Sequence, residues 1–368
     1  MSRVMVLAGD GVGPEVTTQA VRVLEAVARR FDVPLSLHER LVGGASIEQS
    51  GVAVSDETMR LCSDSDAVLF GAVGGLAGAG DGGPRPEEAL FRLRTELGLF
   101  ANIRPVRTLE ALLGSSPLRE ERVREVDLLI VRELSAGLYY GFHENVPGKP
   151  SEIRAHGDEL VAIDTLRYTE GEIARVADVA FRLAEQRRHR VTSVDKANVL
   201  SSSILWRRVV DEIATDFPAV GCEHLLVDAC AMALLARASS FDVIVTENLF
   251  GDILTDEASM LVGSLGMLPS ASVGTRRTPG GLFGLYEPVH GSAPDIAGRD
   301  MANPCGAILS AAMLLRHSLG RDDAANAVEK AVTEVFDAGY RTADLGGGSE
   351  SVGTDRMGEL VEERILAC

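Results

Sequence analysis

The stretch Phe241–Ser259, FDVIVTENLFGDILTDEAS, joins a short apolar run to two acidic residues at helical spacing. Val243–Val245 predicts a buried strand, which breaks at residues 246–248 and is followed by a helix-like segment. On that segment Asp252 and Asp256 lie four residues apart, so both carboxylates project from one helix face. Two like charges this close repel each other unless a cation such as Mg²⁺ or Mn²⁺ lies between them. An acidic, solvated helix start is the ordinary alternative, because acids also favour the helix dipole.

Strand-like and helix-like segments alternate along the chain, which is typical of α/β proteins. Further strands are predicted at Val4–Ala8, Ala67–Val73, Val126–Val131, Val191–Val194 and Leu225–Val227. Apolar residues at helical spacing predict helices after Gly9–Pro14, over residues 173–184 and over residues 308–319. Glycine and proline predict a loop over residues 74–86, and residues 135–164 are predicted to form an irregular, protruding arm.

The composition indicates a folded, acidic, globular protein. The chain has 368 residues, of which 46% are hydrophobic, and this length predicts two domains. Its 36 Lys and Arg against 54 Asp and Glu give a formal charge of −18, which argues against general binding to nucleic acid or membrane. Five scattered cysteines without a CxxC pair fit a reducing compartment. The start of the chain does not resemble a signal peptide and no apolar run is long enough to span a bilayer, so we expect a cytoplasmic protein.

The glycine-rich segment Gly9–Pro14, GDGVGP, follows a predicted strand and opens a predicted helix. It is not a dinucleotide fingerprint, because that pattern needs a glycine where Pro14 or Val16 stands. A tight turn is the better interpretation, with Pro14 suited to the first helical position.

Arg94, Arg104 and Arg132 are candidate anion-binding residues. Arg132 follows a predicted strand, at the edge where open α/β sheets bind ligands. Guanidinium groups bind carboxylates through two parallel hydrogen bonds. An ordinary surface arginine is the alternative for each of the three.

Three further residues each have two interpretations. Lys196 follows a predicted strand and is either a base, if its pKa is lowered, or a solvated lysine. Tyr139 is either a general acid or an aromatic core residue. Asp228 is either a third metal ligand or, as the sequence favours, the N-cap of a helix over residues 229–236.

The segment Glu287–Asp295, EPVHGSAPD, is predicted to be a loop. Gly291, Ser292 and Ala293 would let a ligand approach the backbone closely. Asp295 could accept hydrogen bonds from a ribose diol and repel a 2′-phosphate. A purely structural turn is the alternative.

Together, these and other motifs resemble the β-decarboxylating family of isocitrate and isopropylmalate dehydrogenases, over nearly the whole chain. They are GDGVGPEV at 9–16, GAVGG at 71–75, LGLFANIRP at 97–105, VREL at 131–134, DTLRYT at 164–169, SVDKANVL at 193–200, ENLFGDILTDEAS at 247–259, GSLGMLPSAS at 263–272 and EPVHGSAPDIAG at 287–298. The resemblance implies an α/β, two-domain fold with a mixed sheet, not a Rossmann fold. It implies an NAD-binding domain of residues 1–100 and 253–368, and a second domain of residues 101–252 with the dimer interface and the arm, near 135–164.

The resemblance also implies roles for single residues. Asp252 and Asp256 match metal-binding aspartates, which Asp228 of the partner subunit completes. Lys196, also contributed by the partner subunit, matches the base that takes the hydroxyl proton. Tyr139 matches the acid that protonates the enol.

Substrate and cofactor contacts follow from the same resemblance. Arg94, Arg104 and Arg132 match the arginines that bind the malate carboxylates, and Leu90 and Phe91 would lie beside the substrate's side group. The residues that would contact NAD are Gly74, Gly75, Glu87, His290, Gly291, Ser292, Ala293, Pro294, Asp295, Ile296 and Asn303.

These roles imply a homodimer with shared active sites that decarboxylates a 3-substituted malate, using NAD and Mg²⁺ or Mn²⁺. Isopropylmalate and leucine biosynthesis are the expected substrate and pathway. Two departures leave the side group open, since one methylene discriminates by only about 1–3 kcal/mol. Residues 76–83, LAGAGDGG, replace a bulkier segment, and Phe91 replaces a leucine. The alternatives are isocitrate, homoisocitrate, tartrate or another alkyl or aryl malate, and a catalytically silent regulatory subunit, which the presence of all the matched site residues disfavours.

Overall fold

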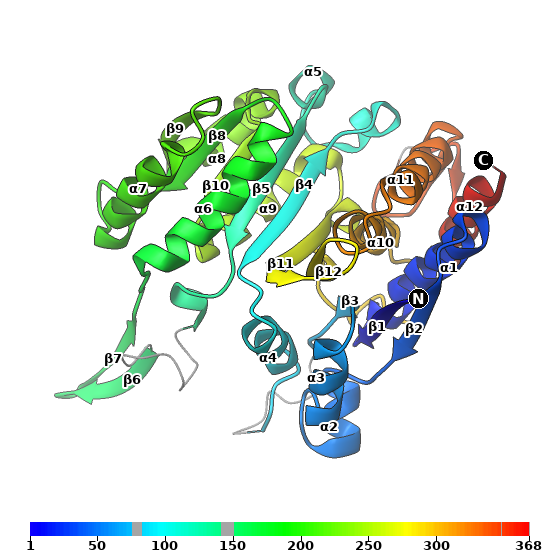
Figure 1. Ribbon diagram of the computed structural model, residues 1–368, viewed down its shortest axis with the longest axis horizontal. Helices are drawn as coiled ribbons and strands as arrows, with labels where there is room; N and C mark the ends of the chain where they lie inside the picture. Colours follow the sequence, from blue (N-terminus) through cyan, green and yellow to red (C-terminus); the bar gives the residue numbers. More distant parts are fainter. Residues whose placement is uncertain (76–82, 141–150, 347, 368) are drawn as a thin grey trace. The chain divides into compact units, whose positions relative to one another are not determined.

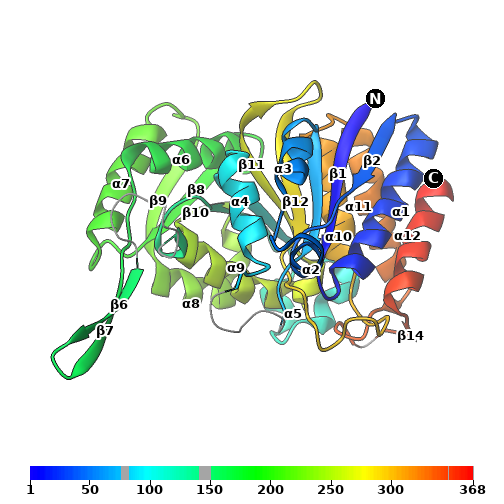
Figure 2. The ribbon, with the colours of Figure 1, turned by 90° about the horizontal axis from the view of Figure 1, so that it is seen from below.

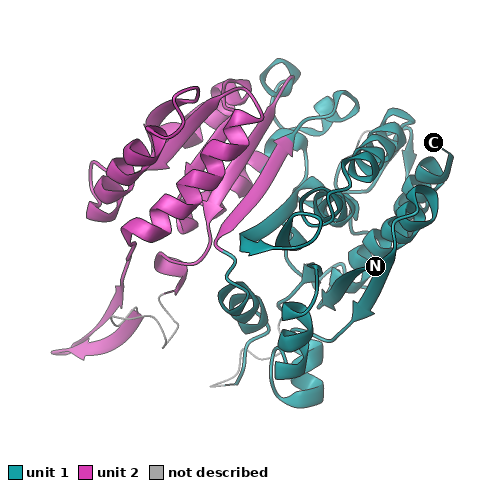
Figure 3. Cartoon of the chain, viewed as in Figure 1, with its two compact units in different colours: residues 1–99, 107–124, 259–368 teal, residues 100–106, 125–258 magenta. Residues whose placement is uncertain are grey.

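A computed structural model describes residues 1–75, 83–140, 151–346 and 348–367, and Figures 1 and 2 show its ribbon from two sides. The chain divides into two compact units (Figure 3). Unit 1 contains residues 1–99, 107–124 and 259–368, and unit 2 contains residues 100–106 and 125–258. The division into domains at residues 100 and 252 stays a prediction.

Unit 1 has a mixed sheet with the strand order β2-β1-β3-β12-β11. The strands are β1 (Ser2–Gly9), β2 (Leu35–Glu39), β3 (Ala67–Ala72), β11 (Pro269–Arg277) and β12 (Leu282–Pro288). β1 runs parallel to β2 and β3, and β12 is parallel to β3 but antiparallel to β11. The antiparallel pair distinguishes this sheet from the parallel sheet of a Rossmann fold, as predicted.

Helices with apolar faces pack together beside this sheet. α1 (Gly13–Phe31) contacts both α10 (Cys305–His317) and α12 (Thr354–Ala367), and α11 (Asp322–Asp337) contacts α10 and α12 (Figure 1). The shorter elements of unit 1 are α2 (Gly44–Ser50), α3 (Asp56–Ser63), α4 (Glu88–Glu96), η1 (Glu110–Ser115), α5 (Glu120–Val123), η4 (Leu265–Met267), β13 (Tyr340–Arg341) and β14 (Glu350–Ser351). The predicted loop at 74–86 lies partly outside the described residues, and α4 begins soon after it.

Unit 2 has the strand order β4-β5-β10-β8-β9, with β5, β10, β8 and β9 parallel. The strands are β4 (Ala101–Arg107), β5 (Asp127–Glu133), β8 (Arg190–Asp195), β9 (Gly221–Leu226) and β10 (Val243–Thr246). The helices are η2 (Leu138–Tyr140), α6 (Glu170–Glu185), α7 (Ser201–Ala214), α8 (Val227–Arg237), η3 (Ala238–Ser240) and α9 (Asn248–Val262). Because every residue of β10 is buried, the apolar run Val243–Val245 forms the predicted inner strand, and α9 follows it directly.

Several predicted boundaries are wrong by a few residues. Arg132 lies within β5, not after it, because the ladder with β10 continues to a Thr246–Arg132 pair. Val227 begins α8, so Leu226 is the N-cap and Asp228 lies in the first turn. Glu287 belongs to β12, not to a loop, because it pairs with Ser270.

The predicted irregular arm contains an antiparallel hairpin instead. β6 (Ser151–His156) pairs with β7 (Glu159–Asp164), and the hairpin extends away from the helices of unit 2 (Figure 2). Its apolar side chains Ile153 and Leu160 are 76% and 77% exposed. Residues 141–150 of this arm lie outside the described part of the chain. Within the described residues, no helix is long and apolar enough to cross a membrane.

Candidate active site

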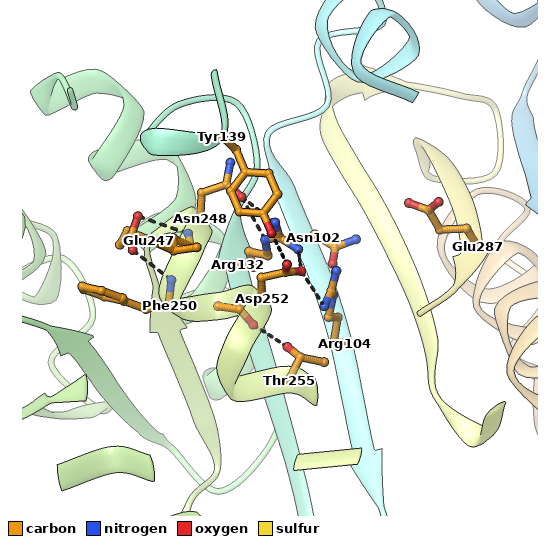
Figure 4. Close-up of polar contacts among 12 residues, drawn as sticks. Asn102, Arg104, Arg132, Tyr139, Glu247, Asn248, Phe250, Asp252, Thr255 and Glu287 are labelled. Atoms are coloured by element: carbon orange, nitrogen blue, oxygen red, sulfur yellow. Dashed lines mark hydrogen bonds and ion pairs between the residues drawn. The ribbon is translucent and has the colours of Figure 1, made fainter. Parts of the chain in front are cut away.

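The site in unit 2 begins where β10 passes into α9. The Glu247 carboxylate accepts hydrogen bonds from the backbone N–H groups of Leu249, at 3.2 Å, and Phe250, at 2.9 Å (Figure 4). An acidic side chain in this place satisfies N–H groups that a helix start leaves unpaired. Burial raises the pKa of Glu247. The start of α9 is therefore fixed by a buried side chain.

Asp252, one turn into α9, is the point where three polar side chains converge. Arg132 Nη1 forms an ion pair with Asp252 Oδ1, and Arg104 Nη1 lies 3.7 Å from the same oxygen. The Tyr139 hydroxyl donates to Asp252 Oδ2, so both carboxylate oxygens are engaged (Figure 4). The Arg132 guanidinium also lies 4.9 Å from the centre of the Tyr139 ring. Residues from β4, β5, η2 and α9 thus meet at one carboxylate.

Electrostatics at this carboxylate affect its neighbours. Burial and the hydrogen bond to Asp252 raise the pKa of Tyr139, so its hydroxyl keeps its proton near neutral pH. Burial and then the charge of Asp252 raise the pKa of Asp256, while Arg104 and Arg132 oppose that rise. α9 includes both aspartates, and the effect of one charge on the other agrees with the shared helix face expected from their spacing.

The donor set of α9 suits a hard divalent cation. Asp252 and Asp256 supply carboxylate oxygens, and their mutual repulsion would fall if a cation lay between them. Among the described residues of this single chain, no group of three or more His, Cys, Asp or Glu side chains is placed to hold a metal ion. Asp252 and Asp256 of one chain are therefore not joined by a third such side chain within the described residues.

Lys196 and Asp228 are brought together elsewhere in unit 2. Lys196 follows β8, and its Nζ lies 2.5 Å from Asp228 Oδ1, in the first turn of α8. This hydrogen bond lowers the pKa of Asp228, whose side chain is 60% exposed. The Lys196 backbone N–H donates to Ser203 Oγ at 3.0 Å, which fixes the turn after the strand. Within one chain the structure does not unite this pair with Asp252 and Asp256 into a metal-binding group.

Arg94 belongs to unit 1 and has a different partner from the other two arginines. It lies on α4, and its Nη2 is 2.9 Å from Glu287 Oε1 on β12. Both side chains are nearly buried, at 11% and 9% exposed. Leu90 and Phe91 precede it on the same helix, and Leu90 packs against the apolar core of the unit.

A second cluster of unit 1 joins the GDGVGP turn to the predicted cofactor loop. The Val12 N–H donates to the Ser292 carbonyl at 2.8 Å. A Cβ at Gly11, whose φ is +59°, would lie 1.9 Å from that carbonyl oxygen, so only glycine fits there. The Asp10 carboxylate accepts from the backbone N–H groups of Gly44 at 2.9 Å, Ala45 at 3.3 Å and Gly74 at 3.2 Å.

The Asp10 carboxylate of this turn occupies N–H groups of other segments. The N–H groups at the start of α2 could have bound an anion, but the Asp10 carboxylate occupies them. The turn instead ties the segments around Gly44, Gly74 and Ser292 together. Pro14 stands at the second residue of α1, one place later than predicted.

Of the predicted cofactor residues, His290 has the most informative environment. Its Nδ1 lies 2.9 Å from the Gly291 carbonyl oxygen, while Nε2 is buried without a hydrogen-bond partner among the described residues. Burial lowers the pKa of His290, which keeps the ring neutral near pH 7. An orphaned ring nitrogen of this kind fits a polar ligand. Asn303 Nδ2 donates to Asp344 at 3.1 Å, and Glu87 is the N-cap residue of α4.

Sequence reasoning missed four residues that shape these sites: Asp10, Asn102, Glu247 and Asn248. Asn102 Oδ1 accepts from Arg104 Nε at 2.5 Å, and Asn248 Oδ1 accepts from Arg132 Nε at 3.0 Å. A usable signal was the position of Glu247 and Asn248 at the break between an apolar strand and a helix. No local signal pointed to Asn102.

A protein-family model described as isocitrate/isopropylmalate dehydrogenase matches residues 3–361. The chain belongs to this family. It is therefore a decarboxylating dehydrogenase, of a type that uses a nicotinamide cofactor and a divalent metal ion.

Individual proteins of the family are also similar to this chain. The chain is 52% identical to a 3-isopropylmalate dehydrogenase from Anaeromyxobacter dehalogenans, over 99% of each chain. It is 48% identical to the protein of that name from Aquifex aeolicus, over 99% of this chain and 97% of the other. Among solved structures, isocitrate dehydrogenase from Methylococcus capsulatus matches with a TM-score of 0.86, 34% identity and full coverage of both chains.

Proposed function

We propose that the protein converts (2R,3S)-3-isopropylmalate and NAD⁺ into 2-oxo-4-methylpentanoate, CO₂ and NADH, as a step of leucine biosynthesis. The observation that carries the proposal is the convergence of Arg104, Arg132 and Tyr139 on Asp252, in a chain whose relatives at about half identity bear that name. A site rich in guanidinium groups beside paired aspartates suits a hydroxy-diacid and a divalent cation together.

Metal binding is proposed for Asp252 and Asp256 with Asp228 of the partner subunit. The incomplete ligand set within one chain supports a third ligand from outside it. The exposure of Asp228, at 60% of its side chain, leaves that carboxylate accessible to a second copy. Bound Mg²⁺ or Mn²⁺ would supply Lewis-acid polarisation of the 2-oxo group, which lowers the barrier to loss of CO₂.

Substrate binding is proposed for Arg104 and Arg132, with Arg94 from unit 1. In the structure, the Asp252 carboxylate partly neutralises the charges of Arg104 and Arg132. When the diacid binds, a substrate carboxylate is proposed to replace Asp252 as the partner of these two arginines. The low exposure of Arg132, at 3%, makes its charge more effective than that of a surface arginine. Leu90 and Phe91 are proposed to face the alkyl side group.

Proton transfer is proposed for two residues. Lys196, from the partner subunit, removes the hydroxyl proton while hydride leaves C2 of the malate for NAD⁺. Its contact with Asp228 supports this role, because that contact places the Nζ atom beside a proposed metal ligand. After CO₂ leaves, Tyr139 gives a proton to the enol. Its raised pKa supports the role of acid, since the hydroxyl is protonated when the enol forms.

The cofactor is proposed to be NAD, bound by Gly74, Gly75, Glu87, His290–Ile296 and Asn303. The Nε2 atom of His290 is buried and has no hydrogen-bond partner in the described part of the chain, which supports a ligand with hydrogen-bonding groups, such as the adenine ring. Asp295 is exposed, so its carboxylate can accept from a ribose diol and repel a 2′-phosphate. This charge favours NAD over NADP.

A homodimer in the cytoplasm completes the proposal. Large apolar side chains are exposed on the helices of unit 2: Ile204 on α7 at 60%, Met232 on α8 at 66% and Ile253 on α9 at 58%. Apolar groups this exposed favour an interface between copies. The described cysteines Cys62, Cys222, Cys230 and Cys305 are free, which suits a reducing compartment.

A second candidate is the same chemistry on another 3-substituted malate. Phe91, in place of a smaller leucine, favours this candidate because it changes the shape proposed for the side-group pocket. The segment 76–83, the other departure from the family, lies almost wholly outside the described residues.

A substrate panel tests the proposal. Purified protein with Mn²⁺ and NAD⁺ or NADP⁺ is given isopropylmalate and malates with other alkyl, aryl or carboxyalkyl groups, and the absorbance of reduced cofactor is followed. We expect the highest kcat/KM for isopropylmalate with NAD⁺. A higher value for another malate would select the second candidate. No turnover of any malate by an intact dimer would support a regulatory subunit instead.

A further inference from the structure

Asn248, the first residue of α9, uses its side-chain amide and its backbone N–H in contacts with other segments of unit 2. Its side-chain oxygen Oδ1 accepts from Arg132 Nε at 3.0 Å and from Arg132 Nη2 at 2.7 Å. Its Nδ2 donates to the Ala136 carbonyl at 2.9 Å, and its backbone N–H donates to the Tyr168 hydroxyl at 3.0 Å. The residue is 1% exposed, so water does not compete for these contacts.

The two contacts to Arg132 fix the direction of the guanidinium. A guanidinium is planar, and Asn248 holds the edge formed by Nε and Nη2. The remaining Nη1 end then points towards Asp252 (Figure 4). The contact to Ala136 fixes the turn that leads to Tyr139, three residues later in the chain. One amide therefore restrains both the arginine and the tyrosine of the candidate site.

We infer that Asn248 is a positioning residue that presents Arg132 and Tyr139 to the substrate, an inference that rests on the proposed function. The chemistry of a neutral amide is essential to this role. A carboxylate at this position would accept the same two hydrogen bonds but add a buried negative charge beside Arg132. It could not donate to the Ala136 carbonyl, and it would weaken the attraction of Arg132 for a substrate carboxylate.

Arg104 shows the same arrangement, which supports the inference. Its Nε is held by the Asn102 amide at 2.5 Å, while its Nη1 faces Asp252. Elsewhere in unit 2, buried carboxylates hold arginines instead, as Asp242 holds Arg187 at 2.9 Å. Each of the two arginines that contact Asp252 thus has its Nε atom held by a neutral asparagine, Asn102 for Arg104 and Asn248 for Arg132. A neutral partner leaves the positive charge of each guanidinium available at the site.

The test is the substitution Asn248→Asp, which nearly preserves the size of the side chain. It adds a negative charge and removes the Nδ2 donor to the Ala136 carbonyl. Because Arg132 would lose hydrogen bonds to a charged substrate carboxylate, we expect the KM for the malate to rise about tenfold or more. The KM for NAD⁺ should stay within about twofold, because the cofactor residues lie in unit 1. Binding of an alkylsuccinate, which has both carboxylates but no hydroxyl, is measured by calorimetry and should weaken by a similar factor.

The matched control is Asn326→Asp. Asn326 also accepts from an arginine, Arg316 Nη2 at 2.7 Å, but on the surface of unit 1. The control should leave both KM values and alkylsuccinate binding unchanged. If Asn248→Asp does not fold, as judged by circular dichroism, Asn248→Ser takes its place with the same expected rise in KM.

The outcomes separate the inference from the function on which it rests. An active wild type with unchanged malate KM and alkylsuccinate affinity in the Asn248 variant overturns the inference alone. A loss of kcat with both KM values unchanged overturns the role of Asn248 towards Arg132, because Arg132 would then still bind substrate normally, and supports only its role towards Tyr139. A wild type that oxidises no malate overturns the proposed function and the inference with it.

Discussion

The start of α9 in unit 2 and the GDGVGP turn of unit 1 hold their surroundings in different ways. At α9, side chains contact side chains, and charged groups from several strands and helices meet at Asp252. At the turn, a single side chain, Asp10, gathers backbone N–H groups from separate segments, and Gly11 allows close contact with Ser292. The comparison teaches that unit 2 concentrates charge at one carboxylate, where we propose that the diacid and the cation bind, while unit 1 shapes its backbone in the region where we propose that the cofactor binds.

The largest expected effect comes from Asp252→Asn, which removes the carboxylate at the centre of the charged region. Turnover should fall on the order of a thousandfold or more, because a proposed metal ligand is lost and Arg132 loses its ionic partner. Mn²⁺ should raise the melting temperature of the wild type but not of the variant. Glu257→Gln on the same helix is the control and should retain the Mn²⁺ response. An unchanged response in Asp252→Asn would remove this aspartate from metal binding.

Lys196→Met should abolish proton removal with little effect on folding. A general base contributes about 10²–10⁴-fold, so kcat should fall by that range. Gel filtration should show the same dimer as the wild type, and NAD⁺ affinity should persist. Asp228 would lose its partner at 2.5 Å, so its lowered pKa should return towards normal. Near-normal turnover in the variant would contradict the assignment of lysine as base.

Asp10→Asn tests the backbone cluster of unit 1 with a smaller expected effect. Asparagine offers one acceptor oxygen where the carboxylate offers two, so at least one of three N–H groups loses its partner. The KM for NAD⁺ should rise about tenfold, since an unsatisfied group costs about 1–3 kcal/mol, while the KM for the malate should stay nearly constant.

The control for this change is Asp66→Asn. Asp66 also accepts from a backbone N–H, that of Arg3 at 2.8 Å, but this hydrogen bond is exposed. It should change neither KM. A rise in malate KM alone for Asp10→Asn would mean that the two regions are not separable in the way the comparison states.

The last expected effect is on stability and not on activity, and it concerns Glu133, which follows Arg132 in β5. Burial raises the pKa of this carboxyl from 4.5 to about 7, despite hydrogen bonds from the Ser135 and Ala136 N–H groups. The folded state therefore binds this proton more tightly than the unfolded chain. Its stabilising contribution is present below pH 4.5 and is lost as the pH rises through about 7, a change of about 3 kcal/mol.

Glu133→Gln should remove this pH dependence. Melting temperatures measured between pH 5 and pH 8 should fall less steeply in the variant than in the wild type. Glu159→Gln, on the exposed hairpin, is the control and should follow the wild-type curve. Parallel curves for wild type and Glu133→Gln would show that the carboxyl titrates normally in the folded protein.

Much of the fold was predictable because its signals are local. The apolar run Val243–Val245 formed a fully buried strand, and the periodic residues near 173–184 formed α6. The predictions failed where long-range pairing decides the boundary. Arg132 joined β5 because β10 extends far enough to pair with it, and the arm residues Ser151–Asp164 formed a hairpin through cross-strand hydrogen bonds. Neither partner can be recognised from one segment alone.

In the candidate site, too, local features were predictable and long-range contacts were not. The spacing of Asp252 and Asp256 already specified a common helix, and the GDGVGP sequence already excluded a dinucleotide fingerprint. Only the folded chain revealed that Asn248 holds Arg132, 116 residues earlier, and that Asp10 holds Gly74. Helical periodicity repeats within a few residues, so it can be recognised from the local amino-acid sequence. The partner of a buried charge depends on which distant segments the sheet brings alongside it, and that is settled when the whole core packs.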